Sequence, residues 1–458
     1  MNRRRALQLM GAGFGMVGLA DALHSAGSAG SLTPKQPHFP PRAKNVIFLF
    51  LNGGLSHLDT FDPKPELTRR DGQPMPGPKI KTDRAAGNLM ASPFTFKKYG
   101  QSGIEVSEIF PRVAATIDDF CVVRSCFSDN GNHTPSLFMM NCGHQLTGRP
   151  SLGAWVTYGL GTENQNLPGF VVLCPGMPNA GPPLWSSAFL PSSYQGVYIP
   201  LKEREVEKQV PNIRNARGLS GADQERQLRL LSQLNRVYVD RVGPQPELES
   251  SIEAMEVAYR MQSEVPEVFD IGKETEKTRA RYGESEFGRG VLMALRLAER
   301  GVRMVQVYFG NFQPWDSHDD IRVHARLAKD ADCVIAALIE DLKARGLFNQ
   351  TLVMIGSEFG RTPMIQVSGL EKLGKGRDHN IHGFTTLFAG GGVRGGTVYG
   401  ATDDLGLKAV ENPVHVHDIH ATVLHLLGLD HTRLTFRHSG RDYRLTDVHG
   451  NVVKGILA

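Results

Sequence analysis

The chain has 458 residues, of which 40% are hydrophobic and 21% are charged. These fractions are ordinary for a globular protein, and they exclude a wholly disordered chain, a collagen and a polytopic membrane protein. With 51 Lys and Arg against 47 Asp and Glu, the formal net charge is only +4, so nothing in the composition indicates nucleic-acid binding.

The first 30 residues have the pattern of an export signal. Arg3, Arg4 and Arg5 precede an apolar run over residues 10–20, and small residues follow. This pattern predicts a twin-arginine-type signal peptide over residues 1–30, and hence a periplasmic or extracellular protein. The run is shorter than the roughly 20 residues of a spanning helix, so we expect no stable membrane span after signal cleavage. Residues 31–43 contain four prolines and are predicted to form an extended tether.

Six apolar runs are predicted to be strands, and helical patterns separate several of them. The runs cover residues 45–51, 120–123, 169–173, 303–309, 351–355 and 385–388, with helices expected over residues 287–300 and 321–343. Strands that alternate with helices predict an α/β fold with a mostly parallel central sheet flanked by helices. We expect this domain to span residues 44–458. A charged segment over about residues 202–282 has little strand pattern and is predicted to be a helical insertion.

Polar side chains gather at the ends of the predicted strands, where sheets of this kind bind ligands. They follow four of the strands and precede the last one. In chain order they are Asn52, His133, Thr134, Asp316, His318, Glu358, Arg361, Asp378, His379 and His382.

Two short segments in this set have the composition of a metal site. Asp316 and His318 are two residues apart, so on an extended segment both side chains face the same way. Asp378, His379 and His382 lie within five residues. Carboxylate with imidazole suits zinc, manganese or iron better than calcium or magnesium, so we expect a divalent metal, with zinc or manganese first. The alternatives are a polar turn at residues 316–318 and a solvated loop at residues 378–382.

Two other features admit a structural interpretation. Glu358 is costly to bury unless it is paired, and Arg361 is the near partner, so the two can form a structural ion pair. His415, His417 and His420 are expected to be packed or solvated instead of ligating a metal.

Several motifs together resemble a family of uncharacterised exported proteins, the domain of unknown function 1501. They lie at residues 50–65, 259–262, 315–318, 357–363, 378–380 and 440–443, and the resemblance covers about residues 40–455. That family is in turn similar to the alkaline phosphatase and sulfatase superfamily. The resemblance implies an alkaline phosphatase-like fold with a metal site at the strand ends.

The superfamily pattern implies roles for individual residues. Asn52 stands at the position of a metal-binding carboxylate. His133 stands at the nucleophile position, where a histidine can be a nucleophile and can equally be a metal ligand or orient a water, with Thr134 as a back-up nucleophile one residue later. Asp316 and His318 resemble a metal-binding Asp-x-x-x-His with shortened spacing.

The later ligand positions depart from the pattern. Glu358-Phe359 stands where the superfamily has Asp-His, and the last ligand histidine resembles His382, or else His379. Because Phe359 cannot bind a metal and Asn52 is a poorer ligand than Asp, a two-metal phosphatase is not expected. We instead expect one metal held by Asp316, His318 and His382, with Glu358, His379 or Asp378 nearby.

Two classes of function follow, and the sequence leaves open whether the protein is an enzyme. The first is an exported metal-dependent hydrolase of phosphate or sulfate esters, acting on an anionic ester or a sulfated or phosphorylated glycan. In that case His133 would be nucleophile or general base, and Arg361 or Lys375 would stabilise the anion. The alternative is a non-catalytic alkaline phosphatase-like protein that binds an anionic glycan or a partner protein.

Overall fold

The computed structural model describes residues 32–77, 82, 84–210, 246–367 and 373–458, together with scattered positions between 213 and 243. The predicted signal peptide lies outside the described residues. Within the part of the chain that is described, no helix has both the length and the apolar composition to cross a bilayer.

All six predicted strands form, and they build one nine-stranded sheet together with three further strands. Its strands are, from edge to edge, β13 (Thr397–Tyr399), β5 (Phe120–Phe127), β12 (Phe384–Ala389), β9 (Thr351–Gly356), β1 (Asn45–Phe50), β8 (Met304–Tyr308), β6 (Phe170–Cys174) and β7 (Val197–Pro200), with β16 (Val414–His415) beside β5. Every residue of β1, β6, β8, β9 and β12 is buried, which explains why these strands are continuous apolar runs instead of alternating ones.

Strand β12 runs antiparallel to both of its neighbours, while the other pairings in this sheet are parallel. The chain leaves the carboxyl end of β9, forms the antiparallel pair β10 (Gly360–Val367) and β11 (Leu373–Asn380), and enters β12 without a crossover helix. It therefore re-enters the sheet at the edge that it left. This brings residues that precede β12 to the same edge as residues that follow β1, β5, β8 and β9.

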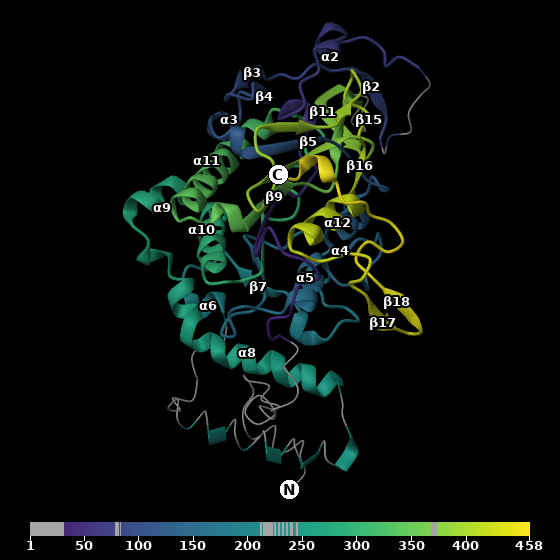
Figure 1. Cartoon of the computed structure of the whole chain (residues 1–458). Coiled ribbons are helices and arrows are strands. Elements are labelled where there is room, and N and C mark those ends of the chain that lie inside the picture. Colours follow the sequence, from purple (N-terminus) through teal and green to yellow (C-terminus); the bar gives the residue numbers. More distant parts are fainter. Residues whose placement is uncertain are drawn as a thin grey trace.

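Helices lie on both sides of the sheet (Figure 1). On one side are α3 (Pro111–Ala115), α9 (Glu276–Tyr282), α10 (Glu286–Glu299) and α11 (Val323–Ala344); on the other are α4 (His133–Cys142), α5 (Leu152–Leu160) and α12 (Val416–Leu426). Helix α10 packs on β1, β6 and β8, and α11 packs on α10. The α/β architecture with a mostly parallel sheet is therefore confirmed.

Short elements complete the described part of the chain. They are α2 (Pro65–Arg69), the strand β2 (Ala86–Leu89) beside β10, and the pairs β3 (Phe96–Tyr99) with β4 (Ile104–Ser107), β14 (Ala401–Thr402) with β15 (Ala409–Glu411), and β17 (Phe436–His438) with β18 (Arg441–Tyr443). The five cysteines are free thiols, four of them buried.

The segment expected to be a helical insertion contains α6 (Val206–Gln209), α8 (Pro246–Val268) and α9, and none of its described residues is in a strand. Helix α8 contacts α10 and lies below the sheet in Figure 1. Residues 32–43, predicted to be an extended tether, contain turns and bends and neither helix nor strand, and they pack on the domain. Their backbone N–H groups donate to the carbonyls of Leu160, Leu426 and Gly428.

Candidate metal centre

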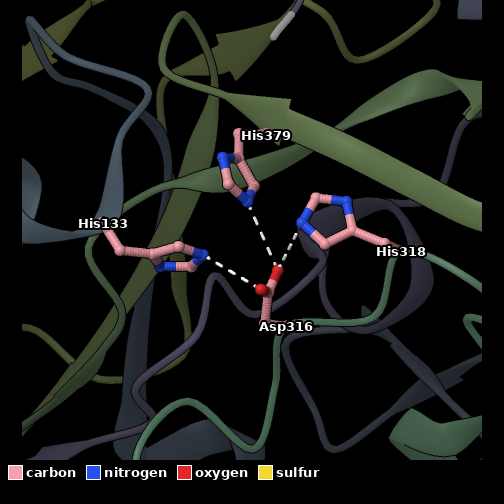
Figure 2. Close-up of side chains that lie close together, drawn as sticks. All are labelled: His133, Asp316, His318 and His379. Carbon is pink, nitrogen blue, oxygen red and sulfur yellow. Dashed lines mark hydrogen bonds and ion pairs between the residues drawn. The ribbon is translucent and has the colours of Figure 1, made fainter. Parts of the chain in front are cut away.

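Four side chains meet at the carboxyl edge of the sheet. His133 begins α4, Asp316 and His318 lie on the connection between β8 and α11, and His379 lies in β11. One ligand atom from each falls within 4.8 Å of all the others. In Figure 2 the three imidazole rings surround the Asp316 carboxylate. We call these four residues the His/Asp cluster; among the described residues it is the one such group.

The Nδ1 atom of each imidazole in the cluster makes a hydrogen bond to an acceptor outside the cluster. The partners are Glu358 Oε1 for His133 at 2.7 Å, the Gly131 carbonyl for His379 at 2.7 Å, and Gln366 Oε1 for His318. All three are acceptors, so Nδ1 of each ring carries the proton and donates it outward. In the neutral ring this leaves a lone pair on Nε2, the arrangement that metal-binding histidines have.

The three Nε2 atoms converge on one carboxylate. They lie 2.8 Å (His318), 3.3 Å (His379) and 3.3 Å (His133) from the oxygens of Asp316. The His133 contact is off the direction of a hydrogen bond, and this buried nitrogen makes no hydrogen bond to any described residue. Lone pairs aimed at a carboxylate repel it unless a cation lies among them. Three nitrogen donors and one oxygen donor fit a divalent transition metal such as zinc or manganese.

The electrostatics of the cluster favour positive charge beside Asp316. Burial by itself raises the pKa of Asp316, but the close contacts with the three histidines and the charge of Arg361 hold that pKa well below its ordinary value. Burial lowers the pKa of His133, yet Asp316 and Glu358 outweigh it and raise the pKa to about 9. The pKa of His379 is lowered, chiefly by burial.

Glu358 lies outside the cluster and contacts His133 through Nδ1, the ring nitrogen that does not face Asp316. It is fully buried, accepts hydrogen bonds from the Gly53 N–H at 3.0 and 3.1 Å and from the Ser357 hydroxyl at 2.9 Å, and faces Nδ1 of His133. Burial raises its pKa, but the hydrogen bond and charge of His133 more than offset this and lower it. These contacts orient His133, and Glu358 is not among the four residues whose ligand atoms converge.

Arg361 supports the cluster from the side. Its guanidinium is fully buried, lies 2.7 Å from Asp316 Oδ1, and also donates to the backbone carbonyls of Gly53, Gly54 and Arg377. The expected Glu358–Arg361 pair is not observed; Arg361 pairs with Asp316 instead. These contacts fix where the carboxylate of Asp316 points.

Two of the residues predicted as ligands are held by other partners. Asn52 Nδ2 donates to the Phe312 carbonyl, and its Oδ1 accepts from the Phe309 N–H at 3.1 Å. The carboxylate of Asp378 accepts from the backbone N–H groups of Arg84 and His379, both at 2.8 Å. These side chains therefore lie outside the His/Asp cluster.

The strand geometry of β11 explains why only one residue of the Asp378-His379 pair reaches the cluster. Neighbouring residues of a strand point to opposite faces, so His379 and Asp378 cannot both face the metal position. His382 follows the end of β11 and is absent from the convergent group, although it was expected to supply the last ligand. Its pKa is lowered by burial and by Lys408.

Thr134 and Phe359 flank the cluster. The Thr134 hydroxyl accepts a 3.2 Å hydrogen bond from Asn179 Nδ2. Phe359 is buried with its ring centroid 4.8 Å from that of His133 and 4.5 Å from that of His379. It packs the two imidazoles and adds no ligand.

From the sequence, His133 stands at a nucleophile position with metal ligand as an open alternative, and it was not in the preferred ligand set of Asp316, His318 and His382. The available signal was its place directly after a strand and at the first turn of a helix, the same edge that carries Asp316. Gln366 and Gly131, which hold His318 and His379, have no local pattern that marks them. They become partners only through the pairing of β10 with β11 and the approach of the loop before α4.

A family model described as "Protein of unknown function (DUF1501)" matches residues 43–457. The chain belongs to this family. The match confirms the family expected from the motifs, and it spans the described domain. No curated protein matches the chain.

Solved structures to which this DUF1501 member is similar include three with low sequence identity. An alkaline phosphatase superfamily protein from Vibrio parahaemolyticus has 9% identity and a TM-score of 0.37, covering 94% of this chain and 76% of that chain. The PsFucS1 sulfatase from Pseudoalteromonas sp. has 12% identity and a TM-score of 0.33, and the match covers 86% of this chain and 68% of that chain. The phosphonate monoester hydrolase SpPMH from Silicibacter pomeroyi has 10% identity and a TM-score of 0.32, and the match covers 70% of this chain and 68% of that chain.

Proposed function

We propose that this protein is an exported metal-dependent hydrolase of phosphate or sulfate esters. One divalent metal, zinc or manganese, would be held by His133, Asp316, His318 and His379. The observation that carries the proposal is that all three imidazoles have Nδ1 fixed by an outer acceptor and Nε2 directed at Asp316. The ester class comes from the resemblance of the motifs to the alkaline phosphatase and sulfatase superfamily, and export comes from the pattern of residues 1–30.

A divalent metal bound at this site supplies Lewis-acid polarisation of an ester oxygen. The chain's own residues do the rest of the binding. We assign His133 as a ligand in preference to a nucleophile, because Glu358 engages its Nδ1 and only Nε2 faces the cluster. Arg361, proposed from the sequence to contact the anion, is assigned to hold Asp316 instead, since its buried guanidinium is engaged by that carboxylate and by backbone carbonyls.

The start of α4 supports binding of an anionic ester group. This helix has ten residues, and its N-cap, Asn132, makes no side-chain cap hydrogen bond. The N–H groups and the dipole of such a helix end favour a phosphate or sulfate. Thr134 lies in this first turn, and its hydroxyl accepts from Asn179, so its own proton is directed elsewhere and can be donated to the ester.

The test is hydrolysis of 4-nitrophenyl phosphate and 4-nitrophenyl sulfate by the mature protein, with and without a chelator. We expect hydrolysis of one of the two esters, lost on chelation and restored by zinc or manganese. His379→Ala should abolish it, while His382→Ala, a matched change outside the cluster, should keep it. Hydrolysis that is insensitive to chelation, or equally impaired in both variants, would contradict the proposal.

A second candidate, a non-catalytic protein that binds an anionic glycan or a partner, is favoured by one observation. Phe359 fills the position of a superfamily ligand and packs on His133 and His379, so the cluster offers one metal position where a two-metal phosphatase needs two. This candidate predicts a bound metal and binding of an anionic glycan without turnover of either nitrophenyl ester.

A further inference from the structure

A pocket of about 510 Å³ lies at the carboxyl edge of the sheet, and none of the residues that line it belongs to the His/Asp cluster. Strands β5 and β16 run parallel and both end at this pocket, with Phe127 opposite His415. Open α/β sheets bind ligands at this edge, and the volume is typical of sites for small molecules. We call it the side pocket; its wall includes Phe127, Asp129, His415, Asp418, His449 and Asn451.

The side pocket adjoins the metal centre through the loop between β5 and α4. Asp129 lines the pocket, and the carbonyl of Gly131, two residues later, accepts from His379 Nδ1 at 2.7 Å. His133, the first residue of α4, follows two residues after Gly131. Because each residue spans at most about 3.6 Å of chain, the backbone of Asp129 lies within about 7 Å of that of Gly131. A molecule bound in the side pocket is therefore a neighbour of the cluster.

One wall of the side pocket is formed by stacked imidazoles. The ring of His449 lies on that of His417, with an interplanar angle of 10° and centroids 5.3 Å apart. His417 is buried, and its Nε2 donates to the carbonyl of Gly143, the C-cap of α4, at 2.8 Å. The stack covers one face of the His449 ring, and its two nitrogens make no hydrogen bond to any described residue. In the neutral ring they are open to a ligand, one as donor and one as acceptor.

The two carboxylates of the side pocket differ in what they leave open. The oxygens of Asp418 accept from the backbone N–H groups of His415 at 2.9 Å and of Asn451 at 2.6 Å. Asp129 Oδ2 accepts from His415 Nε2 at 3.1 Å, while its Oδ1 has no hydrogen bond to a described residue and the side chain is 43% exposed. The Asn451 amide donates to Asp418 at 3.4 Å, and its oxygen has no partner in the described part of the chain. The pocket thus offers acceptors on Asp129 and Asn451, and a donor and an acceptor on His449.

The charge and the hydrogen-bonding groups of the side pocket indicate a neutral, hydroxylated ligand. Two carboxylates line it, and no described residue of its wall is a lysine or an arginine, which disfavours an anion. An ammonium group only donates hydrogen bonds and would leave the donor of His449 unused, whereas a hydroxyl both donates and accepts. The half-buried ring of Phe127, 5.0 Å from that of His415, adds an apolar surface for the C–H face of a sugar ring.

We propose that the side pocket binds a neutral sugar residue next to the reacting ester group, so that the substrate is a glycan ester. This inference rests on the proposed function, because it takes the ester to react at the His/Asp cluster. Hydroxyls of the sugar donate to Asp129 and Asn451 and pair with the two nitrogens of His449. None of these contacts involves the metal, so the sugar residue alone binds to the protein with or without it.

Saturation-transfer NMR of the mature protein tests the side pocket with four neutral probes and one cation. The neutral probes are the methyl glycosides of glucose, galactose, mannose and N-acetylglucosamine, and the cation is tetramethylammonium. We expect at least one glycoside to bind with a dissociation constant of about 1 mM, in the presence and in the absence of a chelator.

Two variants place this binding in the side pocket. His449→Phe preserves a ring that can stack on His417 but removes both nitrogens, so it should weaken glycoside binding about tenfold. Asp129→Ala changes a side chain that is 43% exposed, should weaken binding about fivefold, and keeps the test valid if the phenylalanine variant does not fold. His438→Phe is the control, because His438 is an exposed histidine that stacks on Phe189 outside the pocket, and it should leave the affinity unchanged.

Absence of binding by all four glycosides, binding of tetramethylammonium in their place, or unchanged glycoside affinity in both pocket variants would overturn the inference. Hydrolysis of a nitrophenyl ester judges the proposed function separately. Hydrolysis without any bound glycoside would leave the proposed function standing and overturn the inference. A bound glycoside without hydrolysis would support the sugar site, and it would contradict the proposed function together with the glycan ester as substrate.

Discussion

Nδ1 of His133 lies 2.7 Å from Oε1 of Glu358, a carboxylate that is fully buried at the end of β9. The contact fixes the tautomer of the ring and turns its Nε2 toward Asp316. A carboxylate behind a histidine also makes that histidine a stronger metal ligand. Glu358 therefore acts on the proposed metal through His133 without being one of the convergent ligand atoms.

Replacing Glu358 with Gln should weaken metal binding by about 10- to 100-fold. The amide has the same shape and can still accept from His133, but it lacks the charge that favours a strongly basic Nε2. Competition with a chromogenic zinc chelator measures the affinity. Glu340→Gln, a change at a surface residue paired with Arg281, should leave the affinity unchanged. An unaltered affinity in the Glu358 variant would show that its charge does not act on the metal.

Gly53→Ala should destabilise the protein and displace Asp316. Gly53 has φ +119°, and an added Cβ would lie 2.6 Å from the backbone nitrogen of Asp316. Gly72→Ala is the matched control, since Gly72 also has positive φ (+74°) but no atom within 4 Å of an added Cβ. We expect the Gly53 variant to lose at least about 2 kcal/mol more than the control in urea unfolding, together with its bound metal. Equal losses in the two variants would contradict the close approach.

Arg377→Met should cost about 3–5 kcal/mol of unfolding free energy. Its guanidinium lies 2.8 Å from Asp59, both side chains are fully buried, and the substitution leaves a buried carboxylate without its counter-charge. Arg437→Met, which breaks an exposed pair with Asp442, should cost less than about 1 kcal/mol. Chemical denaturation of both variants checks this difference. A similar cost for both would mean that Asp59 finds another partner.

Stability should fall as the pH drops below about 6.5. Burial lowers the pKa of His324 and of His420 to about 3, so both stay neutral in the folded protein while they are protonated in the unfolded chain. Between about pH 6.5 and about pH 3 the unfolded state thus binds more protons. Each histidine then removes about 1.4 kcal/mol of unfolding free energy per pH unit.

Denaturant titrations at pH 7, 6 and 5 measure this slope. His420→Gln keeps a side-chain donor for the Met140 carbonyl, which His420 Nε2 contacts at 2.8 Å, but it cannot titrate. Its slope should be lower than that of wild type by about one proton. An identical slope in the two proteins would show that His420 does not stay neutral in the fold.

The fold was predictable from the sequence because the central strands are buried on both faces. Runs such as residues 45–51 are almost wholly apolar. A strand that is buried on both faces requires such a run, whichever strands lie beside it. The direction of β12 was not predictable, because it depends on the β10–β11 pair, which returns the chain to the edge it left. The pairing is a long-range property that no local pattern records.

The candidate site was predictable in part. The spacing of Asp316 and His318 correctly placed both side chains together, since extended residues two apart share a face. The same rule separates Asp378 from His379, and its use there would have removed one expected ligand. The structural role of Asn52 could not be predicted from the sequence, because its hydrogen-bond partner, the Phe312 carbonyl, lies 260 residues away in the chain.

The central claim is that His133, Asp316, His318 and His379 hold one metal. The most direct measurement is the metal content of the purified mature protein by elemental mass spectrometry, with His318→Ala and His382→Ala beside wild type. We predict about one zinc or manganese per chain in wild type and in His382→Ala, and loss of that metal in His318→Ala. No stoichiometric metal in wild type after refolding with zinc and manganese, or loss in His382→Ala alone, would contradict the account.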